Sequence, residues 1–163
     1  MNYEKKDWPR LPESMVADLL DYIHEADAIG GDSHGYGIAE APEYLLLWIK
    51  EHLPLSDDFF VGVQRFVGLF NTPVHKDSIR DYCYNCVITA DTATTVFYDE
   101  KLKVTETVKY GQNQWYYHNT NVFHKVTEMD DFRAAITVFK PLPDKVGDQY
   151  ELSNAARKFM KAI

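Results

Sequence analysis

The chain has 163 residues, 45% of them hydrophobic and 26% charged, so it can bury one hydrophobic core and has the composition of a globular domain. Its formal net charge of −8 argues against binding to the phosphate backbone of nucleic acids, which requires a basic surface. No apolar run approaches the ~20 residues of a membrane span, and no secretory leader is recognisable. We therefore expect one cytoplasmic domain over residues 1–163 that binds neither nucleic acid nor a membrane.

The first 55 residues are predicted to be largely helical. Apolar side chains recur at helical spacing in residues 11–26 and again in residues 39–53. The sequence GGDSHGYG (residues 30–37) lacks the preceding strand and the Lys-Ser/Thr ending of a phosphate-binding loop. We interpret it as a connection between the helices, with a lid over a pocket as the alternative, and His34 as a residue of that connection.

Residues 59–140 have the pattern of short β-strands. Successive segments rich in β-branched and aromatic residues are separated by turn residues: FFVGVQRFV, DYCYNCVITA, TTVFYDE, KVTETVKY, QWYYHNT, VFHKV and FRAAITVF. This succession predicts a sandwich or barrel of roughly eight strands. Residues 150–163 are predicted to form a helical tail.

The two cysteines, Cys83 and Cys86, are spaced as C-x-x-C. This spacing occurs in redox motifs and in half of a zinc site. Here the surrounding residues predict a strand, in which positions three apart face opposite sides, so the thiols would not converge on one metal. We predict two structural thiols, with a redox pair as the alternative.

The sequence TPVHKDSIRD contains a candidate for a metal site. His75 and Asp77 are two residues apart, so in an extended chain both side chains leave the same face and can bind one ion. A third ligand would complete the facial triad of two histidines and one carboxylate found in non-haem iron oxygenases. The triplet alone is weak evidence, because the segment is rich in turn formers and is also compatible with a surface turn.

Residues further along the chain supply candidates for the rest of the site. His124 lies in VFHKV, and Arg133 lies in FRAAITVF, which is apolar on both faces and therefore predicted to be buried. A buried arginine needs an anionic partner. If the acidic residues between these strands close a hairpin, Thr137 lies opposite His124 and Arg133 lies roughly 13 Å further along, at ~3.4 Å per residue. A five-carbon diacid chelating a metal at His124 would then place its far carboxylate near Arg133.

The other histidines have no ligand set at a suitable spacing. His24 and His52 lie on or at the ends of predicted helices, without a carboxylate or cysteine at ligand spacing. His118 can share a strand face with His124, but it falls just before a predicted turn at residues 119–121. We interpret all three as surface or packing residues.

The order H-x-D, then a distal His, then an Arg nine residues later resembles the 2-oxoglutarate- and iron(II)-dependent dioxygenases, in particular their prolyl-hydroxylase branch. The stretch HKVTEMDDFRAAITVF is similar to the last two core strands of that branch, and CYNCVITAD is similar to its strand after the H-x-D motif. The resemblance covers residues 59–140. It implies a mainly β fold, the double-stranded β-helix (a jelly-roll or cupin-like barrel), with helices at both ends.

The resemblance also implies the residues of the site. The iron ligands would be His75, Asp77 and His124. Arg133 would bind the distal carboxylate of 2-oxoglutarate. The further pocket residues that it implies are Thr137, Asn85, Val87 and Thr89. At Thr89 the sequence departs from the branch, which typically has a tyrosine there whose hydroxyl contacts the same carboxylate.

The activity implied by the resemblance is hydroxylation of a C–H bond by an Fe(II) centre that consumes 2-oxoglutarate and O₂ as co-substrates, with ascorbate as a further candidate cofactor. The substrate implied is an amino-acid side chain such as proline, free or in a polypeptide, so the expected partner is a small molecule or a peptide. Two other interpretations remain open. One is a cupin-like domain that binds a ligand or another divalent ion without oxygenase activity, and the other is a non-catalytic interaction domain.

Overall fold

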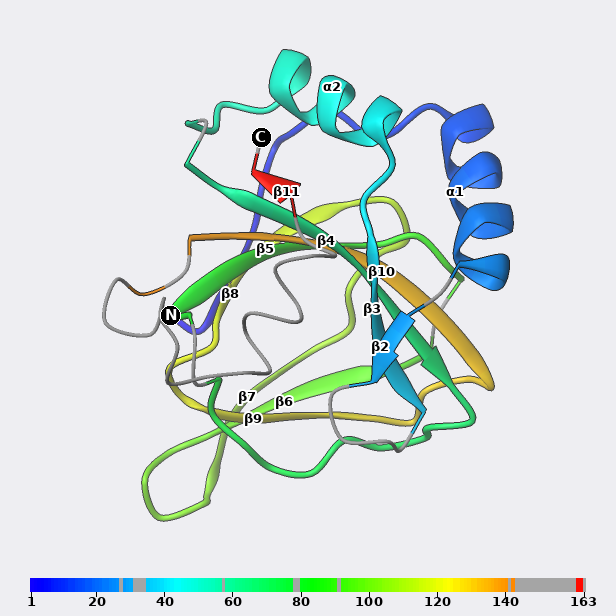
Figure 1. Cartoon of the computed structure of the whole chain (residues 1–163). Coiled ribbons are helices and arrows are strands. Elements are labelled where there is room, and N and C mark those ends of the chain that lie inside the picture. The colour runs from blue at the N-terminus through cyan, green and yellow to red at the C-terminus, as the bar shows by residue number, and fades with distance from the viewer. Residues whose placement is uncertain are drawn as a thin grey trace.

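The computed structural model describes residues 1–26, 28–30, 35–56, 58–77, 80–90, 92–140, 142 and 161–162. Within these residues the chain forms two helices and eleven strands (Figure 1). The helices are α1 (Glu13–Glu25) and α2 (Glu43–His52). The strands are β1 (Tyr3–Lys5), β2 (Ala28–Gly30), β3 (Tyr36–Glu40), β4 (Phe60–Val67), β5 (Tyr82–Val87), β6 (Thr94–Tyr98), β7 (Val104–Val108), β8 (Trp115–Asn119), β9 (Phe123–Thr127), β10 (Phe132–Phe139) and β11 (Lys161–Ala162).

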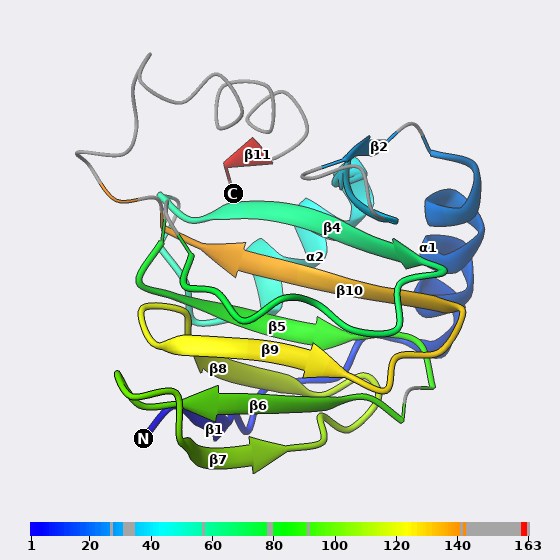
Figure 2. The ribbon, with the colours of Figure 1, turned by 90° about the horizontal axis from the view of Figure 1, so that it is seen from below.

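The strands form two antiparallel sheets. The larger sheet has the order β1-β8-β5-β10-β4-β3-β2, with β11 paired to the start of β4. The smaller sheet has the order β7-β6-β9. In Figure 1 the smaller sheet lies below the larger one, and Figure 2 shows the same strands from below. Chain neighbours β9 and β10 therefore belong to different sheets.

The two helices cover the face of the larger sheet that points away from the smaller sheet (Figure 1). Their apolar stripes supply the fully buried Leu19, Ile23, Leu45 and Ile49 to the main core cluster. The hydrophobic effect that holds this layer comes from removing these side chains and the facing strand residues from water. Neither of these described helices has the length and apolar character needed to cross a membrane.

Strand β10 is central because β4 and β5 pair with its two edges. Alternate residues point to opposite faces of the strand. One set packs in the main core cluster beneath the helices: Phe132, Ala134, Ile136 and Val138. The other set, Arg133, Ala135, Thr137 and Phe139, lies on the face toward the smaller sheet. This alternation, which the sequence predicts, brings Arg133 to the space between the two sheets.

The seven strands predicted between residues 59 and 140 are all present as β4 to β10. The helix predicted in residues 11–26 is also confirmed, as α1. The prediction that Cys83 and Cys86 lie on opposite faces is confirmed as well. Cys86 packs in the core beneath the helices, whereas Cys83 packs on the other face against Phe139, and both thiols are free and buried. Burial raises the pKa of Cys83 to about 11, which disfavours the reactive thiolate.

Two predictions for the N-terminal part are corrected by the structure. The helix predicted in residues 39–53 begins only at Glu43, because the residues before it pair as β3 with the open edge of β4. The segment 30–37 is not simply a connection between helices, since its two ends belong to the hairpin of β2 and β3. Backbone pairing to β4 is a long-range interaction, so the local sequence pattern does not show it. Residues 31–34, including His34, lie outside the described residues.

The helical tail predicted for residues 150–163 is wrong where the structure describes it. Lys161 and Ala162 form β11, which pairs antiparallel with Val61 and Phe60 at the start of β4. Residues 150–160 lie outside the described part of the chain. As with β3, the strand conformation depends on an edge that distant residues provide.

We predict that Ile136→Ala lowers the free energy of unfolding by about 2–5 kcal/mol, because it leaves a cavity in the layer between β10 and the helices. Urea denaturation measures this change. The control is Val104→Ala on β7, where the side chain is 58% exposed and the expected change is within about 0.5 kcal/mol. Equal effects of the two substitutions would contradict the assigned core.

Candidate metal centre

Two backbone hydrogen bonds place the candidate ligands His75 and His124 beside each other. The His75 N–H donates to the His124 carbonyl at 3.0 Å, and the His124 N–H donates to the His75 carbonyl at 2.9 Å. The segment before β5 thus runs along the edge of β9 that β6 does not occupy. The two imidazole rings lie 4.4 Å apart between centroids. A hydrogen-bonded antiparallel pair of this kind projects both side chains to one side of the sheet.

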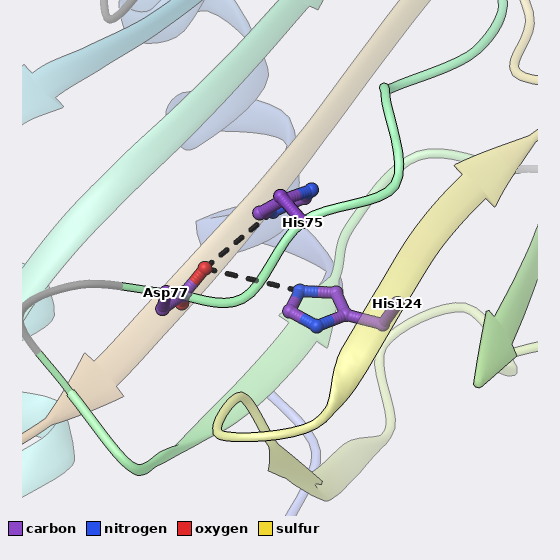
Figure 3. Close-up of side chains that lie close together, drawn as sticks. All are labelled: His75, Asp77 and His124. Atoms are coloured by element: carbon purple, nitrogen blue, oxygen red, sulfur yellow. Dashed lines mark ion pairs between the residues drawn. The ribbon is translucent and has the colours of Figure 1, made fainter. Parts of the chain in front are cut away.

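The backbone also fixes Asp77. Its N–H donates to the Thr120 carbonyl at 3.0 Å, and its side chain turns back toward both imidazoles (Figure 3). One ligand atom each from His75, Asp77 and His124 lies within 4.8 Å of the others. Residues from two separate stretches of chain therefore meet where one ion can bind all three.

The hydrogen bonds of the two imidazoles set their tautomers. Nδ1 of His75 lies 2.8 Å from the Pro73 carbonyl oxygen, and Nδ1 of His124 lies 2.8 Å from the Val122 carbonyl oxygen. A carbonyl oxygen only accepts, so both Nδ1 atoms carry the proton, and each neutral ring has its lone pair on Nε2. These Nε2 atoms face Oδ1 of Asp77 at 3.5 and 3.8 Å. Two lone pairs and a carboxylate that face one another require a cation between them, which is the arrangement of a metal ligand set.

The second carboxylate oxygen of Asp77 is bonded to Arg80. The Arg80 Nε–H donates to Oδ2, and one of its other N–H groups donates to Thr137 Oγ1 at 2.7 Å. Burial by itself raises the pKa of Asp77, but the Arg80 guanidinium and the two imidazoles outweigh it and hold that pKa well below its ordinary range. Asp77 is therefore ionised, with Oδ1 directed at the candidate ion and Oδ2 held by Arg80.

The histidines differ in their protonation. The hydrogen bond with Asp77 raises the pKa of His75 above its ordinary value, although burial acts in the opposite direction. Burial lowers the pKa of His124. In the metal-free protein His75 therefore takes up a proton before His124 does, and this proton competes with a metal ion for the same Nε2 atom.

The candidate ligands line a cavity of about 380 Å³ between the two sheets, which is the size of a small-molecule site. The fully charged side chains in its lining are one carboxylate, that of Asp77, and two guanidinium groups, those of Arg80 and Arg133. A divalent cation would add two further positive charges. The cavity thus favours an anionic ligand, in a chain whose net charge is −8.

The other predicted pocket residues occupy different places. Asn85 and Arg133 line the cavity, and Arg133 is only 6% exposed, with its guanidinium 5.2 Å from the centre of the Phe66 ring. The remaining three are not in the cavity lining. Thr137 instead bonds Arg80, Thr89 accepts a hydrogen bond from the Ala134 N–H, and Val87 packs in a small apolar cluster.

The predicted hairpin between the strands of His124 and Arg133 does not form. β9 pairs with β6 and with the His75 segment, while both edges of β10 are occupied by β4 and β5. Arg133 reaches the same cavity as His124 by crossing from the smaller to the larger sheet. The sequence does not show this, because a hairpin and a sheet crossing can share the same short acidic turn.

Sequence analysis missed three residues of the cavity wall: Arg80, Tyr110 and His118. The interpretation of His118 as an ordinary surface or packing residue is incomplete, since its ring is 4% exposed and lies 4.8 Å from that of His124. Burial lowers the pKa of His118 well below its ordinary value, so the ring is neutral. The available signal was strand parity, which already allowed His118 and His124 to share a face.

We predict that Arg80→Met lowers the affinity for a divalent ion by about 10- to 100-fold, because Asp77 loses the donor that orients its carboxylate. Titration with Mn²⁺ followed by electron paramagnetic resonance measures this affinity. Arg80→Lys keeps the charge and recovers part of the loss. Unchanged affinity in Arg80→Met would show that Asp77 needs no such support.

We predict that His75 titrates above pH 6.5 and His124 below it in the metal-free protein, as measured by ¹H–¹⁵N NMR of the imidazoles. Since a protonated imidazole cannot bind a metal, affinity for a divalent ion rises with pH through the raised pKa of His75. Asp77→Asn removes the acceptor and lowers the pKa of His75. A His75 pKa below that of His124 would contradict the assigned hydrogen bonds.

Comparisons with known proteins give a match of structure only. No protein-family model matches the chain, and no curated protein matches it. An oxidoreductase of the 2OG-Fe(II) oxygenase family from Burkholderia pseudomallei superposes with a TM-score of 0.61 at 10% identity, over 85% of this chain and 83% of that chain. A Pseudomonas putida prolyl-4-hydroxylase gives a TM-score of 0.58 at 15% identity, over 85% of this chain and 91% of that chain.

At these identities the likeness shows the fold. The two facing antiparallel sheets form the double-stranded β-helix, or jelly roll, that the sequence predicts, and the two oxygenases have this fold as well. A cupin protein from Desulfovibrio desulfuricans gives a TM-score of only 0.42. The chain is thus a mainly β, jelly-roll protein with two helices packed on its larger sheet.

Proposed function

We propose that this protein is an Fe(II)- and 2-oxoglutarate-dependent dioxygenase that hydroxylates a C–H bond. One observation carries the proposal. Two Nε2 lone pairs and one carboxylate oxygen converge on a cavity whose other fully charged side chains are arginines. Divalent iron fits this donor set, because His75, His124 and Asp77 make the facial triad of non-haem iron sites and leave three positions open.

The cavity is also suited to a dicarboxylate. A 2-oxo acid that chelates the ion with its keto-acid end has a second carboxylate at the far end. Arg133 reaches the cavity from β10, on the opposite sheet to His124, and its planar guanidinium can bind a carboxylate with two parallel hydrogen bonds. Asn85 adds a buried Oδ1 that has no hydrogen-bond partner among the described residues, as expected of a group that meets a ligand.

Bound iron would supply activation of O₂ and the oxidative decarboxylation of 2-oxoglutarate. The residues of this chain have other tasks. The backbone carbonyls of Pro73 and Val122 hold the Nε2 atoms of the two imidazoles toward the ion. Arg80 leaves Asp77 one free oxygen for coordination. The apolar part of the lining, which includes Phe66 and Val126, keeps water from the reacting groups.

For the substrate we propose an amino-acid side chain, such as that of proline, free or in a peptide. The support for this is the sequence resemblance to the prolyl-hydroxylase branch and the shared fold with a protein named as a prolyl-4-hydroxylase. The side chains of Leu69 and Pro73 line the same cavity and provide apolar surface for an aliphatic ring. A panel of amino acids and peptides, screened by mass spectrometry for the gain of one oxygen, tests the substrate.

We predict that anaerobic addition of Fe(II) and 2-oxoglutarate produces a weak visible charge-transfer band, and that admission of air converts 2-oxoglutarate to succinate. In Arg133→Met the band appears only at a higher 2-oxoglutarate concentration, because the distal carboxylate loses its guanidinium. In His124→Ala both the band and succinate are lost. Absorption titration and succinate quantification by mass spectrometry measure these outcomes.

The control is Arg10→Met, which removes an exposed guanidinium outside the cavity lining and leaves both readouts unchanged. Protein that binds a divalent ion at His75 and His124 but never binds 2-oxoglutarate would refute the oxygenase and favour a cupin-like binding domain. Folded protein that binds neither would favour a non-catalytic interaction domain.

A further inference from the structure

His118 has a polar atom that the fold leaves without a partner. It lies on β8 directly opposite Cys83 of β5, so its side chain shares the cavity face of the larger sheet with Asn85, two residues further along β5. The ring is 4% exposed, and its Nε2 atom has no hydrogen-bond partner among the described residues. A buried ring nitrogen without a partner is unfavourable, so such an atom at a cavity wall indicates a ligand.

The other sides of the His118 ring are occupied. The ring packs edge-on against His124 and at 5.0 Å from Phe97. Nδ1 lies 2.8 Å from the hydroxyl of Tyr110, which is itself stacked on Tyr116 with ring centroids 4.5 Å apart. These contacts fix the orientation of the imidazole. Nε2 is the one ring nitrogen left for a molecule in the cavity.

His118 is not part of the metal ligand set. The ligand atoms that lie within 4.8 Å of one another come from His75, Asp77 and His124, and Nε2 of His118 is not among them. The pair of His118 and Tyr110 instead lines the wall of the cavity that also contains Arg133. A ligand that extends from the ion to Arg133 passes this wall.

The bond to Tyr110 determines what Nε2 offers. When the Tyr110 hydroxyl donates to Nδ1, the proton of the neutral imidazole resides on Nε2, which then donates. In the other tautomer Nε2 would accept. An anionic ligand needs donors, so its binding selects the tautomer in which Tyr110 donates.

We propose that His118 is a further binding residue of this cavity, which donates a hydrogen bond from Nε2 to a carboxylate oxygen of the bound 2-oxo acid, and that Tyr110 is the positioning residue that sets the required tautomer. The inference rests on the proposed function. It supplies a second polar contact to the co-substrate, which Thr89 does not provide because its hydroxyl is bonded to the β10 backbone.

Calorimetric titration of the Mn²⁺-loaded protein with 2-oxoglutarate tests the proposal without relying on turnover. In His118→Leu the Kd for 2-oxoglutarate rises by about 10- to 100-fold, the value of a hydrogen bond to a charged group, while the Kd for Mn²⁺ stays within about threefold of wild type. His118→Gln places an amide N–H near the position of Nε2 and recovers part of the affinity. His52→Gln, which removes an imidazole at the end of α2, changes neither constant.

Tyr110→Phe keeps the ring and removes only the hydroxyl. It raises the Kd for 2-oxoglutarate less than His118→Leu does, and in turnover it raises the KM for 2-oxoglutarate with little change in kcat, which a general loss of structure would not produce. Should His118→Leu fail to fold, His118→Gln and Tyr110→Phe decide the question.

Three results would overturn the inference. The first is a wild-type Kd for 2-oxoglutarate in His118→Leu, or in both His118→Gln and Tyr110→Phe. The second is a parallel loss of Mn²⁺ binding, which would make His118 part of the metal centre. The third is wild-type protein that binds Mn²⁺ but no 2-oxoglutarate, and only this result also refutes the proposed function.

Discussion

The site depends on one reciprocal pair of backbone hydrogen bonds, between His75 and His124. These bonds join the chain before β5 to the edge of β9 and bring both imidazoles to one side of the smaller sheet. The Asp77 N–H continues the same contact with the Thr120 carbonyl, so the H-x-D motif is held by backbone rather than by side chains alone. Because the β-structure positions the ligand atoms in advance, binding an ion requires little reorganisation of the protein.

Charge is distributed in the molecule in a way that matches this site. The chain as a whole is acidic, yet the cavity between the sheets has two guanidinium groups and a single carboxylate. That carboxylate, of Asp77, is divided between Arg80 on one oxygen and the two imidazoles on the other. An ion and a dicarboxylate together would leave little uncompensated charge in a buried space, which is the condition for burying charged groups at all.

Local sequence patterns predicted what depends on alternation. The two faces of β10, the opposite orientations of Cys83 and Cys86, and the shared face of His75 and Asp77 all follow from the period of two in extended chain. What they could not predict depends on partners distant in sequence. β3 and β11 exist because β4 offers edges to pair with, and β9 and β10 separate because each has other partners. His118 was missed for the same reason, since its burial comes from the packing of the two sheets.

The central claim is that three side chains hold one ion and that an anion completes its coordination from within the cavity. A crystal structure of the protein with Mn²⁺ and 2-oxoglutarate, with anomalous scattering used to locate the metal, tests it most directly. The account predicts one anomalous peak bonded to Nε2 of His75, Oδ1 of Asp77 and Nε2 of His124, with the keto-acid end of 2-oxoglutarate in the same coordination sphere. A peak at other residues, or 2-oxoglutarate bound away from the ion, would contradict it.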